Sequence, residues 1–245
     1  MARTRLSLPE IATSPTPTVG VLRPAGRGLI GREVYESVRT AVLDCTLLPG
    51  MALSEQAVSE GLGVSRAPVR EAFRQLVTEG LLEVVPQRGT FVARLSKARI
   101  QDAIFVREVI ECRAAELAAK APLAQRRKLS DILQKQVAAS QQKDYAQHLS
   151  SDEELHHCIL VLAGHPHAWN PLRLARTGMN RIRHLAIPEL GSNKIAIDQH
   201  RQVVRAIIRG DGAKASELMR VHIQSPLGFL DAIQARCPYY FDAGD

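Results

Sequence analysis

The stretch Gly61–Gly80, GLGVSRAPVREAFRQLVTEG, constrains the fold of this 245-residue chain more than any other part of it. A turn that contains Gly63 is followed by Ser65, a residue type that caps helix N-termini, and Gly80 supplies a stop signal. Between these limits, apolar side chains recur every three or four residues and form one flank that a small domain can bury: Val69, Phe73, Leu76 and Val77. The stretch therefore predicts a helix that begins directly after a tight turn.

Arginines follow a neighbouring flank of the same predicted helix, at Arg66, Arg70 and Arg74. The preceding segment, Ser54–Glu60, is predicted to form a short helix of its own. A short helix, a tight turn and a second helix with arginines at its start are typical of proteins that insert a recognition helix into the major groove of DNA. Arginines at this spacing also occur on ordinary solvated helices, so on this stretch alone both interpretations stay open.

Two short strands are predicted after this helix, over Leu81–Val85 and Thr90–Ala93. The turn between them contains Arg88 and Gly89, which place a cation and a permissive backbone at the tip of a two-stranded wing. Such a wing suits contact with phosphates or the minor groove beside a recognition helix. The residues predicted to contact DNA are Ser65, Arg66, Arg70, Arg74, Arg88 and Gly89.

The run from about Ile30 to Ala93 resembles the winged helix-turn-helix domain of the GntR family of bacterial transcription regulators. The family's Ser-Arg-x-Pro-Val-Arg-Glu block is present here as Ser65–Glu71, and the Arg88-Gly89 wing follows it. The resemblance implies that Arg66 and Arg70 contact base edges or flanking phosphates, that Ser65 helps to hold the DNA backbone, and that the wing tip enters the groove.

The charge distribution limits what the DNA hypothesis can depend on. The formal net charge is +7, but residues 29–94 carry seven Lys/Arg and eight Asp/Glu, so the hypothesis depends on placed arginines. The four cysteines have no paired spacing and are expected to be reduced. No apolar run is long enough for a signal peptide or a membrane span, so we expect a soluble, cytoplasmic protein with no membrane partner.

The chain beyond Ser96 changes character, because alanine-rich and leucine-rich helical patterns follow one another without strand-like alternation. We expect a mainly α protein in which this part forms an all-helical antiparallel bundle of six or seven helices. The expected organisation is a disordered basic arm (1–28), a winged helix-turn-helix domain (29–94), a helical effector-binding and dimerisation domain (95–236) and a C-terminal tail (237–245).

Three of the eight histidines occupy inward positions on different predicted helices of this second domain. Asp152 and His156 are four residues apart and share one helical face, while His200 and His222 each fall within an apolar stripe. Three neutral imidazoles and a carboxylate form a compact ligand set for a divalent metal ion, zinc first, with nickel or manganese as alternatives. A buried His/Asp hydrogen-bond network without metal is the other interpretation.

The segment from about Arg99 to Ile233 resembles the helical ligand-binding domain of the FadR subfamily within the GntR family. That domain carries an Asp-x-x-x-His pattern followed by two later histidines, matched here by Asp152, His156, His200 and His222, and its first helix matches at Arg107 and Glu111. The resemblance implies a metal-assisted pocket for a small carboxylate metabolite. Candidates for binding the acid are Arg107, Arg181 and Arg183, because guanidinium groups suit carboxylates.

These patterns together predict a ligand-responsive transcription regulator that has no enzymatic activity. A homodimer would place two recognition helices on palindromic operator DNA, with repression as the expected mode, and an organic acid at the metal would change the affinity for the operator. Two alternatives use the same site of one aspartate and three histidines: a metal-dependent enzyme and a direct metal sensor.

Overall fold

The computed structural model describes residues 30–190 and 192–242, so the predicted arm at residues 1–28 lies outside the described part. The chain forms two compact units. Of the described residues, one unit holds residues 30–38 together with Met51–Val92, and the other holds Arg39–Gly50 together with residues 93–190 and 192–242. No helix in the described ranges combines the length and the apolar character needed to cross a membrane.

The first unit contains the predicted helix-turn-helix. Helix α1 (Ile30–Leu43) buries Val34, Val38 and Val42, which are four residues apart. Helix α2 (Glu55–Leu62) is capped by the Ser54 hydroxyl, which accepts from the Ala57 amide at 3.4 Å. Helix α3 (Arg66–Thr78) packs against α2. The apolar flank predicted for α3 is buried at Val69, Phe73 and Leu76, and Ala72 joins it.

A three-stranded antiparallel sheet completes this unit in the order β1-β3-β2. Strands β2 (Leu82–Val85) and β3 (Gly89–Val92) form the predicted wing, with Val85 opposite Gly89 next to the turn. Strand β1 (Ala52–Leu53) pairs with β3 on its other side. The sequence does not predict β1, because two residues are too few to show an alternation.

The second unit is helical in its described part, as expected. Six helices of 13 or more residues agree with the predicted number: α4 (Lys97–Ala118), α6 (Lys128–Gln141), α7 (Tyr145–Leu162), α9 (Thr177–Leu190), α10 (Ser192–Arg209) and α11 (Gly212–Gln224). Shorter helical segments join or follow them: α5 (Leu123–Arg126), η2 (Pro166–Ala168), α8 (Trp169–Ala175), α12 (Leu227–Arg236) and η3 (Pro238–Tyr240).

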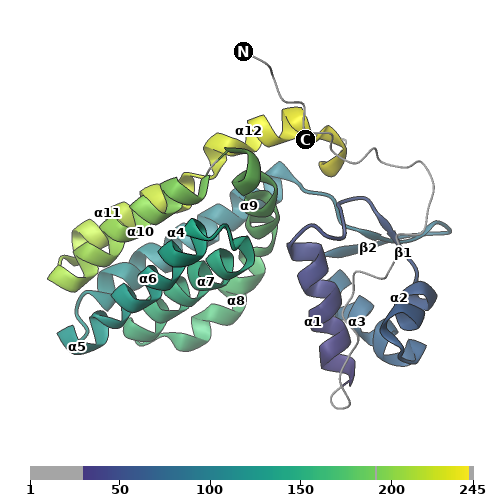
Figure 1. Ribbon diagram of the computed structural model, residues 1–245, viewed down its shortest axis with the longest axis horizontal. Coiled ribbons are helices and arrows are strands. Elements are labelled where there is room, and N and C mark those ends of the chain that lie inside the picture. The colour runs from purple at the N-terminus through teal and green to yellow at the C-terminus, as the bar shows by residue number, and fades with distance from the viewer. Residues whose placement is uncertain (1–29, 191, 243–245) are drawn as a thin grey trace. The chain divides into compact units, whose positions relative to one another are not determined.

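The core of the bundle lies between α4, α6, α7, α10 and α11, which run side by side (Figure 1). Small residues let α4 and α11 approach closely: Ala115 on α4 and Ala215 on α11 are fully buried. At the start of α11, a Cβ on Gly212 would lie 2.7 Å from the Glu116 carbonyl oxygen, so only glycine fits there. The packed interior therefore holds the helices at fixed spacings, which a multi-helix site requires.

The C-terminal segment of the described chain belongs to this core. The Leu95 amide donates to the Tyr240 carbonyl at 2.7 Å, and the Asp242 amide donates to the Leu95 carbonyl at 2.9 Å. Tyr240 and Phe241 are buried, whereas Tyr239 is 66% exposed. The segment before α4 is thereby tied to the segment after α12.

Candidate functional site

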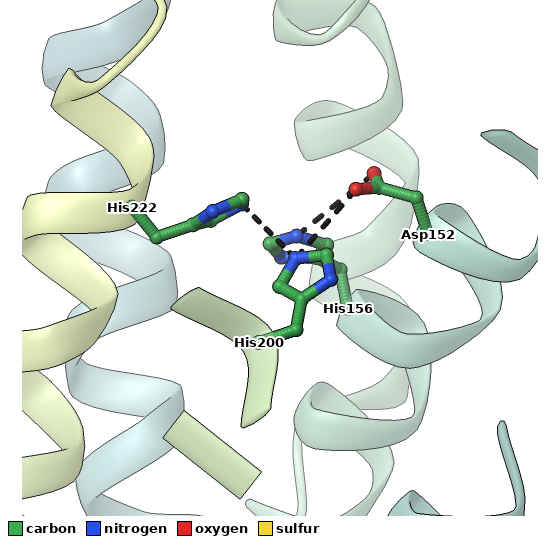
Figure 2. Close-up of side chains that lie close together, drawn as sticks. All are labelled: Asp152, His156, His200 and His222. Carbon is green, nitrogen blue, oxygen red and sulfur yellow. Dashed lines mark hydrogen bonds and ion pairs between the residues drawn. The ribbon is translucent and has the colours of Figure 1, made fainter. Parts of the chain in front are cut away.

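The four predicted metal ligands meet inside the helical bundle. Helix α7 supplies Asp152 and His156 from one face, α10 supplies His200 and α11 supplies His222. Each is at most 2% exposed, and one ligand atom from each lies within 4.8 Å of all the others. Figure 2 shows the three imidazoles and the carboxylate converging on one point.

Each of these imidazoles is oriented by a side-chain oxygen at its Nδ1 atom. His200 Nδ1 donates to Gln136 Oε1 at 2.8 Å and His222 Nδ1 donates to Gln199 Oε1 at 3.1 Å. His156 Nδ1 pairs with the Glu111 carboxylate. Because these oxygens only accept hydrogen bonds, all three rings carry their proton on Nδ1 and keep a lone pair on Nε2.

The three Nε2 lone pairs point to a shared space beside Asp152. His200 Nε2 lies 3.2 Å from His222 Nε2 and 3.6 Å from Asp152 Oδ1, and His156 Nε2 lies 4.0 Å from Asp152 Oδ2. Ligand atoms held about 2.0–2.2 Å from one ion lie roughly 3–4 Å apart, which matches these separations. Two lone pairs this close repel unless a cation attracts both, so the donor set fits a divalent metal ion.

The protonation states also suit metal binding. Burial lowers the pKa of His200 to about 3, and burial likewise lowers the pKa values of His156 and His222, so the imidazoles are neutral at physiological pH. Burial alone would raise the pKa of the Asp152 carboxyl, but Arg183 and Arg176 beside it hold that pKa well below its usual range. A neutral imidazole and an ionised carboxylate are the forms that bind metals.

A buried group of arginines surrounds the ligand set. Arg176 Nη2 and Arg183 Nη1 donate to Asp152 Oδ2 at 2.5 and 2.6 Å, and Arg107 Nε donates to Glu111 Oε1 at 2.6 Å. These three guanidinium groups face two carboxylates, which leaves an excess of one positive charge before any metal is added. Both terminal nitrogens of Arg107 and Nη2 of Arg183 have no hydrogen-bond partner among the described residues.

The structure does not bring all three predicted acid-binding arginines together. Arg107 and Arg183 lie at the site, but Arg181 donates from Nη2 to the Ala93 carbonyl at 2.6 Å, away from the ligands. The sequence pattern does not single out Arg176. The spacing of Arg176 and Arg183, seven residues or two helical turns, could have indicated that both face the same side. However, α8 ends just before Arg176, so Arg176 lies outside any periodic helical pattern.

A cavity of about 30 Å³ opens beside the ligand set. Asp152, His222 and Arg183 contribute to its wall, and His148, Asn193 and Ser225 add further polar groups. Phe229 and Ile182 supply apolar surface. The cavity therefore offers a small polar ligand direct access to the carboxylate and one imidazole of the predicted metal site.

The predicted DNA-contacting arginines project from the exposed flank of α3. Side chains of Arg66, Arg70 and Arg74 are 58%, 53% and 69% exposed. Glu55 at the start of α2 pairs with two of them, 3.7 Å from Arg66 Nη2 and 3.3 Å from Arg70 Nε, while Arg74 pairs with Glu71 at 3.1 Å. Exposed ion pairs of this kind contribute about 0–1 kcal/mol, so phosphates can displace them.

Ser65 and the wing residues are also accessible. Ser65 occupies the N-cap of α3 without a side-chain capping bond in the structure, which leaves its hydroxyl free of the helix. The Arg88 guanidinium lies over the Phe91 ring, 5.9 Å from its centroid. Gly89 is exposed at the tip with a φ of 115°, a backbone conformation that is strained in any residue with a Cβ atom. Helix and wing thus present separate contact points.

Comparisons with protein-family models match two segments of the chain. Residues 30–92 match the model for bacterial regulatory proteins of the gntR family, and residues 102–225 match the FCD domain. The first segment contains α3 and the wing, and the second contains all four ligands of the Asp/His cluster.

Relatives and solved structures agree with these matches. An HTH-type transcriptional regulator in an unstable DNA locus of Streptomyces ambofaciens is 35% identical over 211 residues, 86% of this chain and 89% of that protein. The HTH-type transcriptional repressor RspR of Escherichia coli K12 is 30% identical over 196 residues, 80% of this chain and 86% of RspR. The structure of E. coli McbR/YncC has a similar fold, with a TM-score of 0.72 at 20% identity, covering 84% of this chain and 98% of that one.

Proposed function

The chain belongs to the GntR family of bacterial transcription regulators and carries an FCD domain, and on this premise we propose that a metal-bound organic acid controls its affinity for operator DNA. Helix α3 and the wing would contact the DNA. The cluster of Asp152 and three histidines would hold the metal, and the neighbouring cavity would receive the acid. Repression is the mode we propose, by analogy with the related repressor RspR.

The observation that carries the metal proposal is the orientation of the three imidazoles. Gln136 and Gln199 accept from Nδ1 of His200 and His222, and Glu111 pairs with Nδ1 of His156. The three Nε2 lone pairs therefore face one space beside an ionised carboxylate. Zinc is the first candidate for such a nitrogen and oxygen ligand set, with nickel or manganese as alternatives. The ion would supply a strong positive charge at an open coordination position for an anionic ligand.

Excess positive charge around the ligands favours an acidic effector. An uncompensated charge inside a protein is costly, and a carboxylate entering the cavity would offset the excess contributed by Arg107, Arg176 and Arg183. Arg183 lines the cavity and keeps Nη2 available, so it is our first candidate for a direct contact. Arg107 would add longer-range attraction from the α4 side.

A homodimer is part of this proposal, and the seam between α4 and α11 supplies a surface for it. Glu108 on α4 accepts from Arg220 on α11 at 2.8 Å, which marks the seam. Beside these residues, Phe105 is 70% exposed, Val109 is 59% exposed and Val221 is 53% exposed. Exposed apolar side chains on adjacent helices favour association, and a second copy of the chain would bring a second DNA-binding unit.

The metal and acid sites are tested together by thermal melting of the purified protein against small carboxylates, with and without prior chelation. A ligand that binds the native state raises the melting temperature by mass action. We expect chelation to lower the melting temperature, one acid to raise it, and the effect of the acid to vanish after chelation. His200→Ala should behave like chelated protein, and His167→Ala, an exposed histidine, is the matched control.

Two other outcomes separate the alternatives. A shift on chelation with no response to any acid would favour direct metal sensing. Turnover of an added acid that is lost in His200→Ala while DNA binding persists would favour an enzyme, and would contradict our proposal that the site only binds its ligand.

A further inference from the structure

The cavity beside the ligand set has one wall that comes from outside the helices that carry the predicted ligands. The turn into α12 contributes Pro226, and α12 itself contributes Phe229. Phe229 is half-buried and is the largest apolar side chain that lines the cavity. The other apolar side chains of the lining are smaller: Leu149 and Ile182 are buried in the bundle, and Ala196 ends in a methyl group.

Several contacts hold α12 in place. Leu230 and Ile233 are each 4% exposed and anchor the helix in the core of the bundle. Asp231 accepts from Lys97 Nζ at the start of α4 at 2.8 Å. The segment that follows α12 is fixed by its two backbone hydrogen bonds to Leu95. Helix α12 is therefore a fixed wall, and the size of the side chain that it presents decides how much room the cavity has.

The free space in the cavity is small compared with an organic acid. A volume of about 30 Å³ holds roughly two water molecules. A carboxylate group alone has three heavy atoms, so a substituent on the acid must lie against the apolar part of the wall. Leu149 and Ile182 are packed in the core, where movement is costly, whereas the half-buried ring of Phe229 belongs to no such layer.

We infer that Phe229 determines the size of the acid that the site accepts, because the substituent of the acid packs against its ring. This inference rests on the proposed function, in which the carboxylate of the acid lies near the metal position and Arg183. The site should therefore prefer acids of two or three carbons. A smaller residue at position 229 leaves an apolar hole, and such a hole binds an apolar group of the removed shape.

Matched acids test this inference in the metal-loaded full chain by isothermal titration. Acetate and phenylacetate differ by one phenyl ring, and propionate and 3-phenylpropionate form a second pair with a longer reach. We expect the unmodified protein to bind the unsubstituted acid of each pair about 10-fold more tightly, because the added ring overlaps that of Phe229. Without this wall, burial of the added ring would strengthen binding instead.

The variant Phe229→Ala should reverse the preference within at least one pair, so that the ratio of the two dissociation constants shifts by at least about 10-fold while metal content per chain stays unchanged. Phe229→Leu should shift the ratio in the same direction by a smaller factor, and it decides the matter where Phe229→Ala does not fold. Tyr239→Ala, which removes a 66% exposed aromatic side chain of the same C-terminal segment, is the control and should keep the ratio.

Two results would overturn the size inference and leave the proposed function standing. One is a ratio that stays within about twofold in both Phe229 variants, with binding of the acids still dependent on metal. The other is tighter binding of the phenyl-substituted acids by the unmodified protein. Failure of every acid to bind overturns both the size inference and the proposed function.

Discussion

At the scale of single residues, the candidate metal site depends on side chains that are not among its four predicted ligands. Gln136 and Gln199 fix the tautomers of His200 and His222 through bonds of 2.8 and 3.1 Å. Such outer partners set both the orientation and the basicity of metal-binding imidazoles. They also explain why a buried cluster of neutral histidines can exist beside ionised Asp152, since each ring has a side-chain oxygen beside Nδ1 and keeps a lone pair on Nε2.

The buried neutral histidines predict a specific pH dependence for the metal-free protein. In the folded state the pKa of His200 falls to about 3, whereas an unfolded histidine titrates near 6.5, so the unfolded chain binds more protons at acidic pH. Stability is therefore fully present above about pH 6.5 and is lost as the pH falls below it, by up to about 1.4 kcal/mol per pH unit for each such histidine.

Urea unfolding of chelated protein between pH 7.5 and 5 measures this loss. Added metal should move the loss to lower pH, because the ion and protons compete for the same nitrogens. A free energy of unfolding that stays constant from pH 6.5 to 5 would show that these rings are not buried in their neutral form.

At the scale of elements, the position of each arginine along α3 predicts its role on DNA. A recognition helix contacts base edges mainly through its N-terminal residues. Arg66 and Arg70 lie in the first two turns of α3 and share Glu55, whereas Arg74 lies one turn further on and pairs with Glu71. We expect the first two to read sequence and Arg74 to contact phosphate.

Binding of the variants to specific and scrambled duplexes distinguishes these roles. Arg66→Ala or Arg70→Ala should lose about 1–3 kcal/mol of discrimination between the duplexes. Arg74→Ala should weaken binding to both duplexes equally and reduce the salt dependence. Arg113→Ala, an exposed arginine on α4, is the control and should change neither. An equal loss on both duplexes for Arg66→Ala would assign that residue to phosphate instead.

The sequence predicts elements with a strong period and misses features without one. The stripe of α3 and the four-residue spacing of Asp152 and His156 are visible because a helix repeats every 3.6 residues. Residues two apart face nearly opposite sides of a helix, so only one of Arg181 and Arg183 can face the site. The sequence does not show which one. Gln136 was not singled out, because a glutamine in a helical pattern usually marks a solvated position, and only the packed bundle shows that it is fully buried.

At the scale of the whole molecule, α9 connects the candidate site to both segments that lead to the DNA-binding unit. Arg183 donates to Asp152, and two residues earlier Arg181 donates to the Ala93 carbonyl at 2.6 Å, directly after β3. The Arg181 carbonyl lies 3.7 Å from Cys45 Sγ in the segment that follows α1. A shift of α9 on ligand binding would therefore act on both connections, which is a physical route for coupling.

Arg181→Met tests this route. The change removes the bond to Ala93 and retains an apolar stem, so we expect acid affinity and operator affinity each to stay within about threefold while the coupling between them falls toward onefold. Arg201→Met, an exposed arginine on α10, should leave the coupling intact. Loss of acid affinity in Arg181→Met would instead make Arg181 part of the acid-binding site.

The most direct test of the account is the affinity for operator DNA as a function of acid and metal. The operator is first selected by the protein from a random duplex library, and binding is then followed by fluorescence anisotropy with and without the stabilising acid. We predict that the acid changes the dissociation constant by about 5- to 150-fold, and that chelation or His200→Ala abolishes the change. An acid that binds at the metal yet leaves operator affinity unchanged would contradict the account.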